Sequence, residues 1–183
     1  MAKLIDFKNI DKHLDSTFIF DTNIWLYIHS DYNENDYGYS KVFEYLLENN
    51  CTILLPPIVA TEFINRYCRQ AFQVFKEDKR KETLQAKQNR PRYFSYKLDF
   101  RPTMAYTLKY NYITSLMNED IIPVTQFVAI CQSDLVSAME SPCLADLNDD
   151  IIMNIALRTD SVIVSHDKDY LKANNKLKFL RLD

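Results

Sequence analysis

The chain has 183 residues, a formal net charge of −3, and a composition that is 47% hydrophobic and 13% aromatic. This length and apolar content suit one domain with a sizeable core and exclude a disordered chain. Gly38 is the single glycine. Glycine-rich phosphate loops and dinucleotide-binding turns are therefore excluded, because both need several glycines for the backbone to approach phosphate groups.

Cysteines and histidines are few and scattered. The four cysteines include no CxxC pair, and only three histidines occur, which indicates reduced thiols and excludes a zinc knuckle. The N-terminal stretch "MAKLIDFKNIDKHLDS" mixes both signs of charge and lacks the apolar core of a signal peptide. The longest apolar run, "ILLPPIVA", is far shorter than the ~20 residues that span a bilayer. We therefore expect a cytoplasmic protein without a membrane contact.

In the first half of the chain, β-forming runs alternate with helical patterns. Residues 17–21 predict a strand, and a helical segment follows within 22–30. A helix is expected near 39–49 and a short buried strand at 51–55. Pro56 and Pro57 then open a helix from 58 to about 85, because proline is tolerated in a first helical turn.

The second half of the chain continues this alternation. Pro102 opens a helix that reaches Met117, residues 120–124 predict a strand, and Thr125 caps a helix that runs through Met139. Asn148 caps a helix at 149–159, and the last strands are 161–165 and 178–182. Such alternation predicts an α/β fold, a three-layer sandwich with a mainly parallel central sheet of 4–5 strands.

The middle of the chain is basic and aromatic. Residues 66–109 contain twelve Lys or Arg and four Asp or Glu, together with eight Tyr or Phe. Cations interleaved with aromatic rings suit phosphate contacts and base stacking, but a solvated helical hairpin with inward-packed rings explains them equally well. The candidate RNA-binding residues are Arg66, Arg69, Lys79, Arg80, Lys81, Arg90 and Arg92.

Carboxylates recur where predicted strands end and helices begin. They are Asp21, Glu62, Asp146, Asp149, Asp167 and Asp169. In open α/β sheets ligands bind at the carboxyl ends of the strands, and acids gathered there repel one another unless a cation neutralises them. Oxygen ligands without histidine or cysteine support point to Mg²⁺ or Mn²⁺.

Each acid also has a local explanation. Asp21 alone would be a helix cap, Glu62 alone a solvated helix residue, and Asp149 beside Asp150 a compensation of the helix dipole. Their joint occurrence in this order favours a metal site, because each local explanation covers one position only.

Four stretches carry a resemblance to the PIN-domain nuclease family, in particular to its VapC-like bacterial toxin branch: "FIFDTNIW", "LLPPIVATEFINR", "DIIPVTQFVAICQ" and "LNDDIIMNIALRTDSVIVSHDKDYL". The resemblance covers roughly 17–66 and 120–183. It implies one PIN-like domain over 1–183, with a helical, basic and aromatic insertion at about 68–118. It also implies a metal-dependent ribonuclease with a four-acid cluster.

By this resemblance, the catalytic and metal-binding residues are Asp21, Glu62, Asp149 and Asp167, and the metal is Mg²⁺ or Mn²⁺. Asp146 competes with Asp149 for the third position, and Asp169 is a further candidate ligand. The supporting residues are Thr22, Asn23 and Ser165. The partners implied are RNA, an antitoxin protein and a second copy in a homodimer.

Two alternatives stay open. A phosphatase of the haloacid dehalogenase type would use Asp21 as nucleophile, but it requires a second aspartate where Asn23 stands. A catalytically inactive domain that binds RNA or a protein is the other. Clustered carboxylates argue against it, because they do not help a protein to bind anionic RNA.

Overall fold

The computed structural model describes residues 1–85, 93–144, 146–173 and 175–182. Within these residues a six-stranded sheet has the order β1-β6-β5-β2-β3-β4, and every pairing in it is parallel. The strands are β1 (Lys3–Ile5), β2 (Phe18–Phe20), β3 (Ile53–Leu55), β4 (Gln126–Phe127), β5 (Val162–Val164) and β6 (Lys178–Leu180).

The α/β class and the parallel sheet are confirmed. The sheet has six strands rather than 4–5, and β1 and β4, which the sequence pattern did not predict, are its two edge strands. The edge strands are short and mostly exposed: in β1 only the last residue is buried, and in β4 both residues are exposed. Strands of this kind lack the buried apolar run by which the sequence analysis found the central strands. The central strands β2 and β5 are buried throughout.

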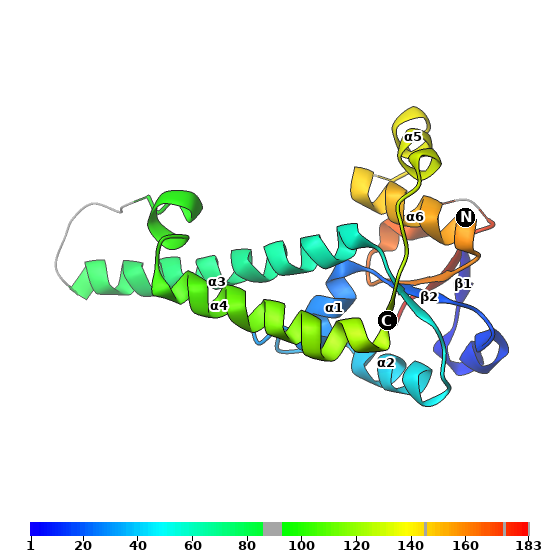
Figure 1. Cartoon of the computed structure of the whole chain (residues 1–183), viewed down its shortest axis with the longest axis horizontal. Coiled ribbons are helices and arrows are strands. Elements are labelled where there is room, and N and C mark those ends of the chain that lie inside the picture. The colour runs from blue at the N-terminus through cyan, green and yellow to red at the C-terminus, as the bar shows by residue number, and fades with distance from the viewer. Residues whose placement is uncertain (86–92, 145, 174, 183) are drawn as a thin grey trace.

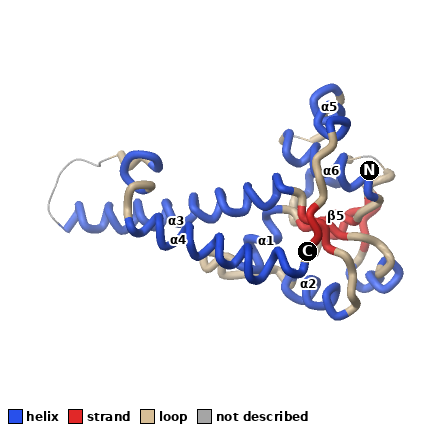
Figure 2. The backbone as a smooth tube through the Cα atoms, viewed as in Figure 1, coloured by secondary structure: helices blue, strands red, loops and turns tan. Residues whose placement is uncertain are grey.

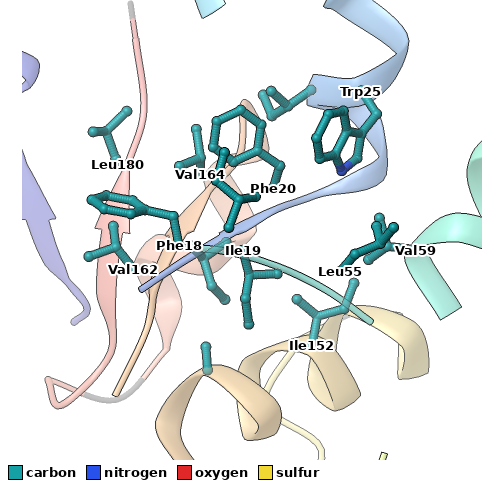
Figure 3. Close-up of a cluster of buried hydrophobic side chains, with 14 of the residues drawn as sticks. Phe18, Ile19, Phe20, Trp25, Leu55, Val59, Ile152, Val162, Val164 and Leu180 are labelled. Atoms are coloured by element: carbon teal, nitrogen blue, oxygen red, sulfur yellow. The ribbon is translucent and has the colours of Figure 1, made fainter. Parts of the chain in front are cut away.

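Helices cover both faces of the sheet. On one face lie α1 (Thr22–His29) and α2 (Tyr39–Glu48), where the ring of Phe20 packs 5.3 Å from that of Trp25 and 5.7 Å from that of Phe43. On the other face lies α6 (Leu147–Thr159), and Ile19 points toward Ile152 there (Figure 3). α5 (Gln132–Glu140) packs on α6. Alternating side chains of β2 thus supply both cores, which gives the three layers expected.

A long helical pair projects from the sheet (Figure 1). It consists of α3 (Pro57–Gln85) and α4 (Met104–Leu116), which run antiparallel side by side, with a π-helical turn η2 (Tyr96–Phe100) between them. The tube view shows that the strands are confined to the end of the molecule away from the tip of this pair (Figure 2). Pro57 is the first residue of α3, as predicted.

The aromatic residues of the middle segment pack mainly against one another. The rings of Phe75 and Phe100 lie 5.1 Å apart, and those of Phe72 and Tyr96 lie 5.4 Å apart at 77°. We call the group the aromatic cluster; its rings are Phe72, Phe75, Phe94, Tyr96, Phe100 and Tyr106. The inward-packed interpretation is therefore correct for these residues, whereas Tyr93 is 90% exposed.

Residues 117–131 depart from the sequence prediction. Where a strand was expected at 120–124, the chain forms a π-helical turn η3 (Met117–Ile121) and a 3-10 turn η4 (Ile122–Val124). The hydroxyl of Thr125 donates to the Ile121 carbonyl at 2.9 Å instead of capping a helix. The strand β4 comes next, and the helix predicted from 125 begins only at Gln132.

Two 3-10 helices and the cap of α6 complete the described fold. The 3-10 helices η1 (Phe7–His13) and η5 (Lys168–Lys172) were not predicted. Asp146, rather than Asn148, caps α6, because its carboxylate accepts the Asn148 N–H at 2.7 Å. In the described parts of the chain, no helix combines the length and apolar character that a membrane crossing requires.

Candidate metal centre

Asp21 lies at the carboxyl edge of the sheet, where β2 and β5 end together. Phe20 pairs with Val164, and the Asp21 N–H donates to the Val164 carbonyl at 3.0 Å. The side chain is only 5% exposed. Its Oδ1 accepts the Thr22 N–H at 2.6 Å, which makes Asp21 the cap of α1. The helix-cap explanation of Asp21 is therefore correct. Asp21 also belongs to the group of acids that is described next.

Two supporting side chains hold the other oxygen of Asp21. Oδ2 accepts the Ser165 hydroxyl at 2.7 Å and the Asn23 amide at 2.8 Å. Ser165 is fully buried and also accepts the Asp167 N–H at 3.1 Å. Because Ser165 follows β5 as Asp21 follows β2, this hydrogen-bond network fixes Asp21 and the loop of Asp167 relative to each other.

Glu62 reaches the same edge from α3. Its Oε2 accepts the Thr22 hydroxyl at 3.2 Å, so the first residue of α1 connects the second acid to the first. Its Oε1 pairs with Arg66 Nε at 2.9 Å. Glu62 is partly buried, unlike the solvated helix residue that it would be in isolation.

Asp149 comes from the first turn of α6, and its Oδ1 accepts the hydroxyl of the buried Tyr170 at 3.4 Å. Burial raises the pKa of Asp149 to about 7. Four carboxylates add to this increase in pKa by repulsion: Asp21, Asp146, Asp167 and Glu62. The other three predicted acids, Asp21, Glu62 and Asp167, are therefore close enough for their charges to act on Asp149.

Asp146 and Asp169 lie at the margin of this group. Asp146 is exposed and caps α6, and Asp149 occupies the more buried position. The carboxylate of Asp169 pairs with Lys172, while its N–H donates to Asp167 Oδ1 at 2.8 Å. Because Asp149 is the more buried of the two, it fits the third position better than Asp146. Asp169 points toward Lys172 instead.

The acids as a group carry an excess of negative charge. The pKa of Asp21 is raised to about 6, chiefly by burial and in smaller part by the charge of Glu62, while the hydrogen bonds from Ser165 and Thr22 oppose the increase. Hard oxygen donors that repel one another in this way fit Mg²⁺ or Mn²⁺ by donor type and charge. Within the described residues, no three Asp, Glu, His or Cys side chains could hold a metal ion as they stand. Binding would therefore require the carboxylates to move closer together.

Sequence reasoning missed two residues that shape this site. Tyr170, the third residue after Asp167, donates a hydrogen bond to Asp149. The buried carboxylate of Asp150 accepts the N–H groups of Cys143 and Leu144, each at 3.0 Å, and so fixes the chain before α6. The sequence signals for both residues were weak. Asp150 is the second aspartate of "LNDD", and Tyr170 stands in "DKDYL", a pattern that many loops share.

Of the candidate RNA-binding residues that the structure describes, Arg66 reaches the acids. The others lie farther along α3. The Arg69 guanidinium lies 4.3 Å from the centre of the Tyr96 ring, Lys79 pairs with Glu82 at 2.7 Å, and Lys81 pairs with Asp78 at 3.7 Å. Arg80 is exposed. Arg90 and Arg92 lie outside the described residues.

Comparison with known proteins identifies the fold. No protein-family model and no curated protein sequence matches the chain. Among solved structures, it is similar to VapBC2 from Rickettsia felis bound to a DNA fragment from their promoter, with a TM-score of 0.52, 14% identity, and coverage of 91% of this chain and 99% of that chain. It is also similar to FitAcB from Neisseria gonorrhoeae, with a TM-score of 0.52, 10% identity, and coverage of 89% and 96%. The fold is PIN-like.

Proposed function

We propose that this PIN-like protein is a metal-dependent ribonuclease that hydrolyses RNA phosphodiester bonds. One observation carries the proposal: four carboxylates from separate elements converge at the carboxyl edge of a parallel sheet, where α/β folds bind ligands. The donors that they bring to that edge are all carboxylate oxygens, which suits a hard divalent ion. The four acids are Asp21, Glu62, Asp149 and Asp167.

In this proposal the four acids hold Mg²⁺ or Mn²⁺. The bound ion would activate a water molecule and stabilise negative charge on the phosphate oxygens. Ser165 and Asn23 fix the orientation of Asp21 through hydrogen bonds to Oδ2. Thr22 orients Glu62, and Tyr170 orients Asp149. Such supporting hydrogen bonds set the position and basicity of metal-binding carboxylates.

Arg66 supplies the positive charge nearest to the acids. Its guanidinium pairs with Glu62 at 2.9 Å, and its side chain is 54% exposed. An exposed guanidinium is suited to a phosphate group, because its planar donors match two phosphate oxygens at once. We assign Arg66 to the phosphate backbone of the substrate.

The phosphatase alternative fits the site poorly. The side chain at the position of the required second aspartate is Asn23, and its amide donates to Asp21 at 2.8 Å. An amide cannot pass a proton to a leaving group and then act as a carboxylate. The inactive binder would bind RNA without cutting it, whereas the ribonuclease would cut it. An assay of RNA cleavage therefore separates the two.

We further propose a toxin of a toxin–antitoxin pair, with an antitoxin protein and a second copy of the chain as partners. The support is the fold likeness to VapBC2 and FitAcB. In the same proposal, residues 1–183 form one PIN-like domain and the segment at about 68–118 is an insertion within it. The projection of α3 and α4 from the sheet supports the insertion (Figure 1).

The test is cleavage of tRNA, rRNA and single-stranded RNA by the purified protein with Mg²⁺, with Mn²⁺ and with EDTA. The proposal predicts metal-dependent cuts that the double variant Asp21→Asn, Asp149→Asn does not make. Asp160→Asn is the matched control, because Asp160 has a left-handed backbone with φ of 52°, which asparagine adopts readily. Equal RNA binding by wild type and double variant, without cleavage by either, would leave only the inactive binder.

A further inference from the structure

A cavity of about 220 Å³ opens beside the acids, between α1 and α3. It is lined by Asn23, Leu26, Tyr27, Asn33, Arg66 and Gln70. Two of these residues also contact the acids directly. Asn23 donates to Asp21 Oδ2 at 2.8 Å, and Arg66 pairs with Glu62 at 2.9 Å. The cavity therefore adjoins the candidate metal centre.

Tyr27 forms an aromatic wall of the cavity and is braced by other rings. Its ring centre lies 4.9 Å from that of Tyr37, 5.7 Å from that of His166, and 6.2 Å from that of Tyr39. His166 directly precedes Asp167. This packing holds the Tyr27 ring in one orientation next to the loop that carries the fourth acid.

The loop that supplies Tyr37 is held in a costly conformation. Tyr37 has a left-handed backbone with φ of 53°, which is rare for a bulky residue and strains the backbone. The Asn35 side chain accepts the Tyr37 N–H at 2.8 Å, and the Asp36 side chain accepts the Gly38 N–H at 2.9 Å. The loop thus keeps an exposed tyrosine against Tyr27 in spite of the strain.

The chemistry of the lining matches one nucleotide. Tyr27 supplies the aromatic side chain of the lining, and bases stack on aromatic side chains. The Asn33 amide donates to the Leu26 carbonyl at 2.8 Å, and Gln70 Oε1 accepts the Ser30 hydroxyl at 3.0 Å. The Asn33 oxygen and the Gln70 amide N–H groups are therefore what the lining offers to the edge of a base. Arg66 adds a positive charge, and none of the residues that line this cavity is acidic, although it adjoins the acids.

We propose that this cavity is a subsite for one unstacked nucleobase next to the phosphodiester bond that is cut, with Tyr27 as its stacking ring. The inference rests on the proposed function and deepens it, because it names the residues that select the nucleotide at the cut. Arg66 contacts the phosphate of that nucleotide, and Asn33 and Gln70 face the edge of its base.

Binding measured in EDTA tests the subsite without cleavage. Five probes are titrated into the protein: the four homotrinucleotides of RNA and an abasic trinucleotide. At least one homotrinucleotide should bind about tenfold more tightly than the abasic probe, because stacking on an aromatic ring contributes this much per base. Repulsion from the acids acts on all five backbones and cancels in the ratio.

Three variants test whether Tyr27 causes the ratio of homotrinucleotide affinity to abasic affinity. Tyr27→Leu should bring it close to one while abasic binding is retained, which also shows that the variant is folded. Tyr27→Phe should keep the ratio, as should Tyr93→Leu, which removes an exposed tyrosine elsewhere.

A wild-type ratio near one for all four bases would overturn the subsite, as would a ratio that Tyr27→Leu leaves unchanged. Because no metal is present, failure of the ribonuclease proposal would appear in the cleavage assay and not in these ratios.

Discussion

Asp21 is a buried carboxylate whose position serves two purposes. A carboxylate removed from water destabilises the fold unless it is hydrogen-bonded, and Asp21 accepts three hydrogen bonds, from Thr22, Asn23 and Ser165. The same bonds leave it beside Glu62 and thus in a group of acids. The abrupt end of the apolar strand at Asp21 is therefore explained by the helix cap and the acidic site together.

Removing the charge of Asp149 should stabilise the metal-free protein. Repulsion and burial raise the pKa of Asp149 from its ordinary 3.8 to about 7, so the ionised form destabilises the folded state. In EDTA at pH 8, we expect Asp149→Asn to raise the free energy of unfolding by about 1–2 kcal/mol, a figure reduced for partial exposure. The asparagine Oδ1 can still accept the Tyr170 hydroxyl.

The pH dependence of this gain has a definite sign. A raised pKa in the folded state means that the folded protein binds more protons than the unfolded chain between pH 3.8 and about 7. The gain should be complete above pH 7, decline as the pH falls, and vanish near pH 4. Urea unfolding at several pH values measures it, with Asp160→Asn as control. A gain that grew toward acid pH would contradict the assigned shift.

At the scale of elements, the buried parts of the fold were predictable and the edges were not. β2 and β5 come from continuous apolar runs, and α6 comes from apolar residues that recur with a helical period. Residues 117–131 misled the prediction because "DIIPV" resembles a strand, whereas Pro123 lacks the N–H that a ladder needs. In the site, Asp21 was predictable because it stands where an apolar strand run ends, and Ser165 was predictable from the family resemblance. Tyr170 was not, because its contact with Asp149 depends on how distant segments pack.

An ion pair joins α5 to α6, beside a hydrogen bond from the Asn154 amide to the Asp134 carbonyl at 3.0 Å. Arg158 donates through Nε and Nη2 to both oxygens of Asp134, which is only 3% exposed. Arg158 thus forms a salt bridge to Asp134 at 2.9 Å. Asp134 Oδ2 also accepts the Cys131 N–H at 2.8 Å. Loss of the arginine would leave a buried carboxylate with fewer partners.

Arg158→Leu should therefore destabilise the protein by about 2 kcal/mol, less than for a fully buried pair because the arginine is partly exposed. Hydrogen exchange should accelerate first in 132–140, before the sheet. Lys178→Leu is a suitable control, since the carboxylate that it leaves behind, Asp160, is 82% exposed, and pairs with such an exposed partner contribute about 0–1 kcal/mol. Equal destabilisation by the two variants would show that the Asp134 pair has no special role.

On the scale of the whole molecule, the basic side chains are concentrated in the projecting part of the chain. Residues 66–109 carry a balance of twelve basic against four acidic side chains, and most of them belong to the projecting α3 and α4 pair (Figure 1). The rest of the chain carries ten basic and twenty-one acidic side chains. The rings of the aromatic cluster are packed inward, whereas Tyr110 and Tyr112 of α4 are exposed, so this pair offers RNA mainly cations and few rings.

Neutralising two of these cations tests their role. Arg80→Gln with Lys81→Gln should weaken binding to every single-stranded RNA similarly, since phosphate contacts carry no sequence information. The slope of log K against log salt should fall by about 1.4, because each neutralised phosphate contributes about 0.7 to the slope on a single strand. Lys8→Gln with Lys12→Gln removes the same charge from the sheet end of the molecule. If both double variants shifted the slope equally, only net charge would matter.

The central claim is that Asp21, Glu62, Asp149 and Asp167 form a divalent-ion site, and Mn²⁺ titration followed by electron paramagnetic resonance tests it most directly. At pH 8, where Asp149 is mostly ionised, the wild type should bind Mn²⁺ saturably. Ser165→Ala should weaken binding about 10–100-fold by removing a hydrogen bond from Asp21, and Asp149→Asn should weaken it further, whereas Asp160→Asn should have no effect. Equal Mn²⁺ binding by wild type and Asp149→Asn would contradict the account.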